Sequence, residues 1–464
     1  MPSIGNWSSG NETALRRVLV AFGLLVLGLM VGWLFLNHRV YVVGLLLAFL
    51  LFIVFFREER LGLALLVGYM PFHDVVLAYF PQSLVGGAKE LLLFAFGGIW
   101  VVKRIVSVSP IVERSRINTA IALLLLAAAM ATVKSSGPLV AAVGWKWYFM
   151  FLPVYFFAAS FDLDEPWLKR MLAVLVATCT LRMLWGFLQY YGSYDLFPVI
   201  LGADRVVNPP IASGALRLHW TNVGPYGVVN VFLIIALWTS LDRKYRPALA
   251  AAMAVTLLAV GYTLLRISWL SIILGVLFLG SMRDRRLWAL LIIIVLVSYL
   301  LGPEVFKERI DLMVSPEQSY TSAKMGGFFR GWLYIVQHDP FGAGMGSVAA
   351  GGFRHLIGSK AASLITTEQG YGDVLIDMGI IGFAAYLFLL STLMREMLNI
   401  ASATGSVAIR AIATVTATIV FITIIGEGIV EYLVIIAPIV WFLVGVVVAS
   451  GKSIRITEII HERS

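Results

Sequence analysis

The chain has 464 residues, of which 60% are hydrophobic and 13% are charged, and its formal net charge is +9. With a mean hydropathy of +0.91, this composition excludes a soluble protein and indicates a polytopic helical membrane protein. The apolar runs are too long and continuous for the alternating strands of a membrane barrel. Cys179 is the only cysteine, so an intramolecular disulfide and a cysteine-based metal cluster are also excluded.

Apolar runs of membrane-spanning length follow one another along the chain, and the first begins after Arg16 and Arg17. It has no small-residue cleavage site, so we interpret it as a retained span rather than a signal peptide. The second run is short, and Pro71 interrupts the third. We therefore expect an all-α polytopic protein, with a single transmembrane domain over residues 1–464 and about 12 to 14 helices. The approximate limits of the runs are 18–36, 40–56, 61–80, 86–102, 117–133, 139–160, 167–190, 222–241, 247–264, 266–281, 286–302, 367–393, 408–426 and 430–450.

Lysine and arginine concentrate in alternate connections between these runs, as at 57–60, 103–116, 243–246, 283–286 and 395–410. Cytoplasmic loops of membrane proteins carry such an excess of basic residues. We therefore expect both termini in the cytoplasm. This topology explains the positive net charge without nucleic acid as a partner and leaves membrane lipids as the expected surroundings.

Two connections on the opposite side contain arginines that this orientation does not explain. One covers residues 191–221, and the other is a large periplasmic loop at 303–366. Part of the larger loop has the spacing of an amphipathic helix that lies in the interface or against the bundle. The apolar residues with that spacing are Phe328, Phe329, Trp332, Leu333 and Val336.

Arg266 lies between the apolar runs 248–265 and 267–279, at the outer mouth of an expected span. An arginine costs about 2.5 to 3.5 kcal/mol at the centre of a spanning helix and less near the interface. Such a residue needs an anionic partner, and phosphate or pyrophosphate fits best. The alternative is that Arg266 extends to lipid headgroups.

Further cations are expected on the same side as Arg266 and complete a candidate anion site: Arg182, Arg205, Arg217, Arg330 and Lys146. Each has an ordinary alternative. Arg330 is also suited to anchoring the loop at the interface, and Arg182 lies inside a span, where it could pair with an acid. Lys146 lies among Trp145, Trp147 and Tyr148, a composition typical of an aromatic belt.

Polar motifs gather in the second half of the chain. Residues 217–226 lead into one span, and residues 263–269 surround Arg266. Residues 330–346 end in a turn rich in proline and glycine, and residues 367–382 open the next span with Glu368 and Gln369.

This order of motifs resembles the O-antigen polymerase and O-antigen ligase superfamily. Its members have an arginine near the start of a mid-chain span, and a large periplasmic loop with a Pro-Phe/Leu-Gly-x-Gly turn. A polar residue then opens the next span, before a Leu-Gly-Ile/Leu-Gly-like signature. Here residues 339–346 match the turn, and 378–382 match the signature with one extra residue between the glycines. The motifs lie between about 205 and 390, and the earlier spans resemble the family only in hydropathy.

The resemblance implies a GT-C-like, inverting glycosyltransferase of the bacterial inner membrane. Its donor would be a glycan on a polyprenyl pyrophosphate, presented at the periplasmic face, and its acceptor a glycan or lipid-linked glycan. Ligases typically have a His-Asn pair where this chain has Glu368 and Gln369. A carboxylate at that position is more typical of the polymerases, which implies a chain-length regulator as a further partner.

The chemistry of the residues agrees with this reaction. Arginine is always protonated and binds phosphate oxygens bidentately, so Arg266 and its neighbours suit a pyrophosphate leaving group. No Asp-x-Asp pair occurs in the expected outer loops, so we expect transfer without a metal or other cofactor. Glu368 is the candidate general base, although a helix N-terminal acid is the alternative. Tyr371 offers a ring for a sugar, and His338 lies near this chemistry, although histidines there are more often structural.

Other functions remain open at this point. A ligase that transfers the glycan to a lipid A core uses the same donor. A transporter or flippase of an anionic solute is the rival from a different class, but transporters commonly show repeated halves and polar breaks near the bilayer midplane. Here the polar residues gather at one face and in one long loop, which favours chemistry at a surface over transport.

Overall fold

A computed structural model describes the following residues of the chain: 53, 56–73, 88–107, 115–161, 163–191, 220–263, 265–282, 285, 287–289, 292, 307, 332–333, 335, 337, 340–348, 370–426 and 432–463. Every regular element among them is a helix. The chain divides into two compact units, residues 1–66 with 87–111 and residues 67–86 with 112–464.

The first unit is described by most of α3 (Glu59–Tyr69) and by α6 (Ala88–Val106). Glu59 at the start of α3 forms an ion pair with Lys103 near the end of α6. Lys103 Nζ also donates a hydrogen bond to the carbonyl oxygen of Phe56 at 3.2 Å. A lysine in the last turn of α6 is favourable because the helix dipole places partial negative charge there.

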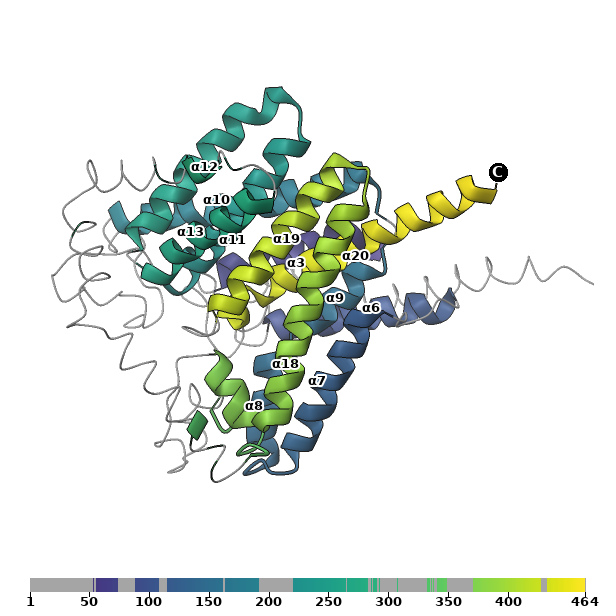
Figure 1. The fold of residues 1–464 in the computed structure, drawn as a ribbon, viewed down its shortest axis with the longest axis vertical. Coiled ribbons are helices and arrows are strands. Elements are labelled where there is room, and N and C mark those ends of the chain that lie inside the picture. Colours follow the sequence, from purple (N-terminus) through teal and green to yellow (C-terminus); the bar gives the residue numbers. More distant parts are fainter. Residues whose placement is uncertain are drawn as a thin grey trace, which may run out of the picture. The chain divides into compact units, whose positions relative to one another are not determined.

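The second unit contains the remaining helices (Figure 1). They are η2 (Met70–Phe72), α7 (Arg116–Thr132), α8 (Pro138–Phe149), α9 (Leu152–Ala159), α10 (Glu165–Tyr191), α11 (Trp220–Ser240), η4 (Arg243–Tyr245), α12 (Arg246–Tyr262), α13 (Arg266–Met282), α18 (Gly370–Ala403), α19 (Val407–Gly426) and α20 (Tyr432–Arg463).

These helices confirm an α-helical, multi-pass membrane protein. Within the described residues, five helices are long and apolar enough to span a membrane, and the bent pair α8 and α9 is a sixth candidate. The predicted runs between 117 and 281 and between 408 and 450 coincide with α7 to α13, α19 and α20, within a few residues at most ends. The runs 18–36, 40–52 and 293–302 lie outside the described residues, so the expected total of helices stays a prediction.

The run predicted at 139–160 is not one straight span. It forms α8 and α9, which meet at an angle of 43°. Pro153 lies at the second position of α9, where proline fits a helix start but cannot donate a backbone hydrogen bond to the preceding turn. The sequence-based prediction of one continuous helix was wrong here because it weighed hydropathy more than this proline.

Glycines and a buried amide hold the helices together. Asn230 of α11 is fully buried, and its Nδ2 donates to Thr180 Oγ1 at 3.1 Å and to Thr256 Oγ1 at 2.8 Å. This amide therefore links α10, α11 and α12. On α13, a Cβ added to Gly275 would meet the ring of Phe232 and the Cδ1 of Ile422, so the missing side chain permits close packing on α11 and α19.

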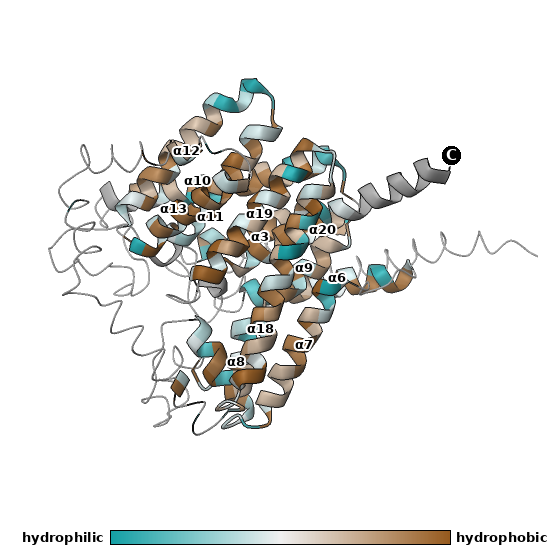
Figure 2. Ribbon diagram, viewed as in Figure 1, coloured by the Kyte–Doolittle hydropathy of each residue, from teal (hydrophilic) through white to brown (hydrophobic). Residues whose placement is uncertain are grey.

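Charged residues mark one end of the second unit. Arg116 at the start of α7 forms an ion pair with Glu396 of α18 at 3.6 Å. Glu165 at the start of α10 accepts hydrogen bonds from Lys169 Nζ at 2.7 Å and from Ser406 Oγ at 2.8 Å. The connections before α7 and after α18, which the charge pattern assigns to one side of the membrane, therefore meet at one end, together with the start of α10. The helices between the ends are mainly hydrophobic (Figure 2).

Candidate functional site

The candidate site is built around a reversal of the chain within α18. Gly379 has φ 67° and ψ −167°, which no helical residue adopts, and it separates two helical parts. The rings of Tyr371 and Tyr386 lie only 6.2 Å apart, although a straight helix would separate residues 15 positions apart by roughly 22 Å. Residues 370–378, the short arm, therefore fold back against residues 380–403, the long arm (Figure 1).

This reversal corrects the expectation of one uninterrupted span at 367–393. The long arm is long enough to cross a membrane by itself. The residues before Gly379 instead run antiparallel to the long arm. The start of the short arm at Gly370 therefore lies about two helical turns along the long arm, near Tyr386. The hydropathy of the run could not reveal the reversal because both arms are apolar.

The predicted proline–glycine motif docks on this reversal. Ala343 N donates to the carbonyl oxygen of Ile376 at 2.7 Å, and Ile380 N donates to the carbonyl oxygen of Pro340 at 2.9 Å. A Cβ on Gly342 would approach Gly379 N to 2.5 Å. Residues 340–346, the glycine turn, thus contact the short and long arms through these backbone atoms.

Glycine is required in this turn because of its backbone conformation and because neighbouring backbone atoms leave no room for a side chain. Gly342, Gly344 and Gly346 have φ values of 84°, 107° and 85°, a region that other residues rarely adopt. On the far side of the turn, Gly346 packs against Gly144 of α8. The turn therefore fills the space between the reversal in α18 and the neighbouring helix α8.

The connection between α7 and α8 completes this contact. Lys134 Nζ donates to the carbonyl oxygen of Gly342 at 3.3 Å and lies 5.6 Å from the ring centre of Phe341. Ser135 Oγ donates to the carbonyl oxygen of Met345 at 3.0 Å. Three segments that are far apart in the sequence, around 134, 342 and 379, therefore meet at one end of the second unit.

A buried carboxylate binds these segments from within. Asp377 on the short arm is fully buried. Its Oδ2 accepts hydrogen bonds from Tyr148 OH at 3.1 Å and from Gly346 N at 3.3 Å, and its Oδ1 accepts one from Val348 N at 2.8 Å. Both oxygens of Asp377 therefore accept hydrogen bonds that help to hold the glycine turn on α8 and α18.

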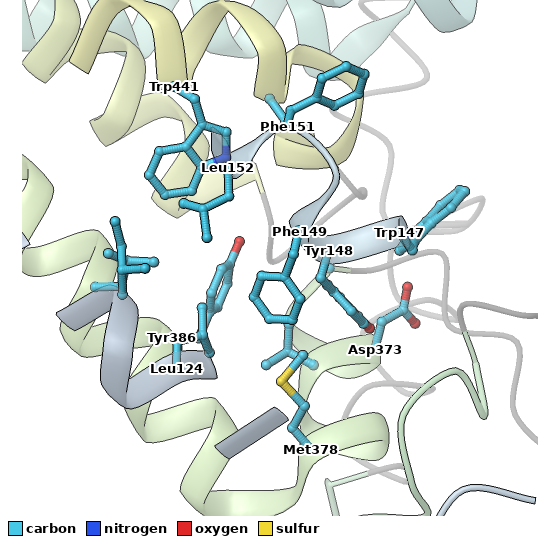
Figure 3. A pocket seen from close by; sticks show the side chains of 15 residues that line it. Leu124, Trp147, Tyr148, Phe149, Phe151, Leu152, Asp373, Met378, Tyr386 and Trp441 are labelled. Carbon is cyan, nitrogen blue, oxygen red and sulfur yellow. The ribbon is translucent and has the colours of Figure 1, made fainter. Parts of the chain in front are cut away.

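A second acid, Asp373, lies one helical turn before Asp377 and is also buried. It lines a cavity of about 40 Å³ between the bend of α8 and α9, the two arms of α18, and α20. Figure 3 shows Asp373 with the aromatic side chains around this space, which we call the aromatic cavity. The aromatic residues that line it are Trp147, Tyr148, Phe149, Phe151, Tyr386 and Trp441.

Two of the residues that line the aromatic cavity, Asp373 and Tyr148, bring polar groups to it and lie beside each other (Figure 3). The indole Nε1 of Trp147 is buried and has no hydrogen-bond partner among the described residues. A water molecule needs about 10 to 15 Å³ and polar partners, so the volume and the polar groups of the cavity suit water. The same volume is too small for a sugar ring in this conformation.

The helices around Arg266 form a second candidate region, and none of the residues that line the aromatic cavity belongs to α11, α12 or α13. Arg266 is half-buried at the first position of α13. A Cβ on Gly224 of α11 would approach Ser268 Oγ to 2.6 Å, and Gly275 packs on Phe232 further along both helices. These contacts show that α11 and α13 run parallel, so the described part of the first motif, from residue 220, lies beside residues 265–269 near the N-termini of both helices. Helix N-termini attract anions.

Arg182, a predicted anion ligand, lies in a different environment. It is 1% exposed in the middle of α10, and its Nε donates to the carbonyl oxygen of Pro71 at 2.9 Å. Pro71 belongs to η2, at the break that the sequence predicted in the third apolar run. The guanidinium therefore binds backbone at a helix irregularity, where a buried carbonyl group needs a donor.

The other described candidates are Lys146 and Tyr371. Lys146 is exposed in the last turn of α8. Tyr371 is half-buried in the first turn of the short arm, and its hydroxyl donates to the carbonyl oxygen of Ile424 in α19. Tyr371 thus fixes the free end of the short arm to α19. The ring also contacts Phe383 of the long arm.

The remaining candidates lie outside the described residues. They are Glu368, Arg205, Arg217, Arg330 and His338. Part of the predicted amphipathic helix is described: residues 332, 333, 335 and 337 are helical, Ile335 packs on Leu375 and Ile376, and Leu333 is 53% exposed. This segment therefore packs against the bundle through Ile335, which the predicted apolar face did not include, and through Trp332, which it did include and whose ring lies 6.1 Å from that of Phe383.

Sequence reasoning missed both buried acids of the short arm. A signal was present, because Asp373 and Asp377 are four positions apart within an apolar run. Ionisable residues inside apolar spans usually face the protein interior, and this spacing places both on one face of a helix. Tyr148 and Lys134 could not be found in this way, since only the tertiary fold brings them to the short arm and the glycine turn.

Comparison with known proteins adds no family to this description. No protein-family model matches the chain, and no curated protein matches it. Within the described residues, no group of three or more His, Cys, Asp or Glu side chains is arranged to hold a metal ion. What the described site offers chemically is a pair of buried carboxylates, a cationic helix N-terminus and aromatic walls.

Proposed function

We propose that the protein is an inverting membrane glycosyltransferase that polymerises polyprenyl-pyrophosphate-linked oligosaccharide units. The observation that carries this proposal is the contact between the two motifs of the resemblance. The glycine turn at 340–346 and the signature at 378–382 join through backbone hydrogen bonds, although they are over 30 residues apart. Because the two motifs form one structural unit, we expect them to occur together in one chain, as they do in the superfamily that the sequence resembles.

The reaction follows from the chemistry of the candidate residues. The acceptor hydroxyl oxygen attacks the anomeric carbon, and the bond between that carbon and the phosphate oxygen breaks. The lipid pyrophosphate leaves with the bonding electrons, and the carboxylate of Glu368 takes the hydroxyl proton. Arg266, with Arg217 and Arg330, stabilises the negative charge that develops on the leaving group.

The position of Arg266 supports its part in this proposal. It begins α13 beside the parallel helix α11, so two helix N-termini and a guanidinium lie close together. Each N-terminus contributes about half a positive charge. This is a suitable environment for a pyrophosphate.

The proposal includes a location and partners. The protein would lie in the bacterial inner membrane with both termini in the cytoplasm, and the glycine turn would face the periplasm. The donor is a polyprenyl-pyrophosphate-linked glycan, and a chain-length regulator would act on the product. A ligase uses the same donor chemistry, so the acceptor separates the two enzymes.

The test is transfer by the purified protein in lipid vesicles, with a defined lipid-linked donor. A second lipid-linked unit and a lipid A core oligosaccharide are supplied as acceptors in separate reactions. Products longer than one repeat on the polyprenyl lipid support the polymerase, and glycan on the core supports the ligase. We expect the rate to be the same with EDTA, and a rate restored only by magnesium would contradict metal independence.

Glu368→Gln tests the proposed base in the same assay. The amide keeps the size and the hydrogen-bonding capacity of the side chain but is a very poor base. We expect donor binding to persist and turnover to fall by about 10² to 10⁴, the usual contribution of a general base. Glu396→Gln is the matched control, because Glu396 lies at the opposite end of α18 beside Arg116. Turnover of Glu368→Gln close to wild type would make Glu368 a helix-terminal acid.

A further inference from the structure

Asp377 connects three parts of the candidate site that the sequence separates widely. Its carboxylate accepts hydrogen bonds from Tyr148 of α8, from Gly346 of the glycine turn and from Val348 just after it. The side chain itself belongs to the short arm of α18. Because Asp377 is fully buried, these hydrogen bonds do not compete with bulk water, and a change in any one partner alters the whole contact.

The same carboxylate fixes the direction of the short arm. Gly379 alone allows the arm to fold back, but a glycine permits many conformations and specifies none. Direction comes from contacts on both sides of Gly379. Before it, Ala343 N donates to the carbonyl oxygen of Ile376 and Gly346 N donates to Asp377, and after it Ile380 N donates to the carbonyl oxygen of Pro340. At the other end of the arm, the Tyr371 hydroxyl binds the carbonyl oxygen of Ile424.

The short arm and Tyr148 also form walls of the aromatic cavity. Asp373, one turn before Asp377, and Tyr148 both line it, and Figure 3 shows them beside each other. A displacement of the Asp377 contact would therefore move a carboxylate and a ring of this cavity together.

We propose that Asp377 is a positioning residue, which holds the short arm, Tyr148 and the glycine turn in the arrangement that glycosyl transfer requires. The effect on transfer rests on the function proposed above. The hydrogen-bonded contact itself does not, and it is tested separately. Asp377 acts through its neighbours and does not contact the reacting atoms.

The first experiment measures the contact without any assay of activity. In a Cys179→Ala background, Val348→Cys is the single thiol and lies next to the carboxylate. Maleimide labelling of this thiol in the purified full chain should become several-fold faster when Asp377→Asn is added. The Asn side chain has only one oxygen that can accept hydrogen bonds, so one of the contacts that hold residues 346–348 is lost and the thiol becomes more accessible. Ser402→Cys is the control, since Ser402 is exposed in the last turn of α18, away from Asp377, and should react at the same rate in both backgrounds.

The second experiment measures transfer with a double-mutant cycle. Asp377→Asn should lower kcat by about 10-fold or more, the size expected for lost hydrogen bonds to a charged group, with the KM for the donor unchanged. Tyr148→Phe removes only the hydroxyl and should reduce kcat less. In the double variant, Tyr148→Phe should add almost nothing, because its hydrogen bond is already lost. Tyr386→Phe, on the same cavity, should instead combine with Asp377→Asn multiplicatively.

The outcomes separate the two proposals. Unchanged labelling of Val348→Cys in Asp377→Asn would overturn the positioning role, and so would independent effects of Tyr148→Phe and Asp377→Asn on kcat. A loss seen in donor KM alone would also overturn it. If Asp377→Asn speeds the labelling but the wild-type protein transfers no glycan, the proposed function is wrong. The role of Asp377 is then limited to stabilising the fold.

Discussion

Two arginines show how the surroundings of a residue decide its role. Arg182 is buried within α10, and its Nε donates to a backbone carbonyl at the irregular η2. Arg266 is half-buried and begins α13, next to the N-terminal part of α11. The side chains are chemically identical, but only the second lies where helix N-termini favour an added anion. We therefore expect opposite consequences when each is replaced.

For Arg266, we predict a loss of transfer even when the positive charge is kept. Arg266→Lys retains one charge but loses the bidentate geometry for phosphate oxygens, so kcat should fall, and Arg266→Ala should cost on the order of 10² or more. The measurement is the rate on a defined lipid-linked donor at equal protein amounts. Arg243→Lys is the control, because Arg243 is exposed in η4 at the far end of α12. Normal rates for Arg266→Ala would remove it from the donor site.

For Arg182, we predict a loss of stability rather than of donor binding. Arg182→Met fills similar space but leaves the carbonyl oxygen of Pro71 without this donor, which should cost about 1 to 3 kcal/mol. Thermal unfolding in detergent should therefore shift to a lower temperature, while the KM for the donor stays the same. A raised KM with an unchanged unfolding temperature would restore Arg182 as a ligand of the pyrophosphate.

At the scale of elements, α18 is two helices joined at one residue. The left-handed conformation of Gly379 turns the short arm back on the long arm. The glycine turn then covers the reversal, and Ile380 N, the first backbone donor of the long arm, binds the carbonyl oxygen of Pro340. A helix N-terminus leaves such donors unsatisfied unless another segment supplies acceptors. The turn therefore serves as the cap of the long arm.

Gly379→Ala tests this arrangement. Alanine is strained by about 1 to 2 kcal/mol at positive φ, and its Cβ would meet the carbonyl oxygen of Pro340 at 2.5 Å. We predict a clear loss of thermal stability together with a loss of transfer. Gly405→Ala is the matched control, because nothing lies within 4 Å of a Cβ added to Gly405 in the connection after α18. Equal unfolding temperatures for the two variants would argue against the tight contact between Gly379 and the glycine turn.

At the scale of the molecule, the second unit has two chemically different ends. One contains the ion pair between Arg116 and Glu396 and the contact between Glu165 and Ser406. The other contains the glycine turn, the reversal at Gly379 and the connection with Lys134. Because α7 and the long arm of α18 run between these ends, we expect the two groups of residues to lie on opposite sides of the membrane.

Single-cysteine labelling of intact cells tests which end faces which side. In a Cys179→Ala background, Ser347→Cys reports on the glycine turn and Ser402→Cys on the last turn of α18. We predict that an impermeant maleimide labels Ser347→Cys in cells whose inner membrane is intact, and labels Ser402→Cys only after that membrane is permeabilised. The reverse pattern would invert the topology, and with it the periplasmic site.

Much of the helical architecture could be predicted from the sequence. The apolar runs at 117–133, 247–264, 266–281 and 408–426 match helices within a few residues, because spanning the membrane requires continuous apolar stretches with internal backbone hydrogen bonds. The charge pattern also placed Arg116 and Arg410 at one end, as the helices do. The glycine turn and the signature were both recognised as motifs from their residue types.

The sequence by itself therefore determined that the chain forms apolar helices, where most of the described ones lie, and that Gly342, Gly344 and Gly346 form a turn. These properties depend on residues that are near one another in the chain. The tertiary structure alone decided that α18 reverses at Gly379, that the glycine turn caps it, and that Asp377 receives donors from Tyr148 and Val348. Those contacts join residues up to 229 positions apart. The hydropathy of a segment cannot predict them, because an apolar helix that continues and one that folds back have the same hydropathy.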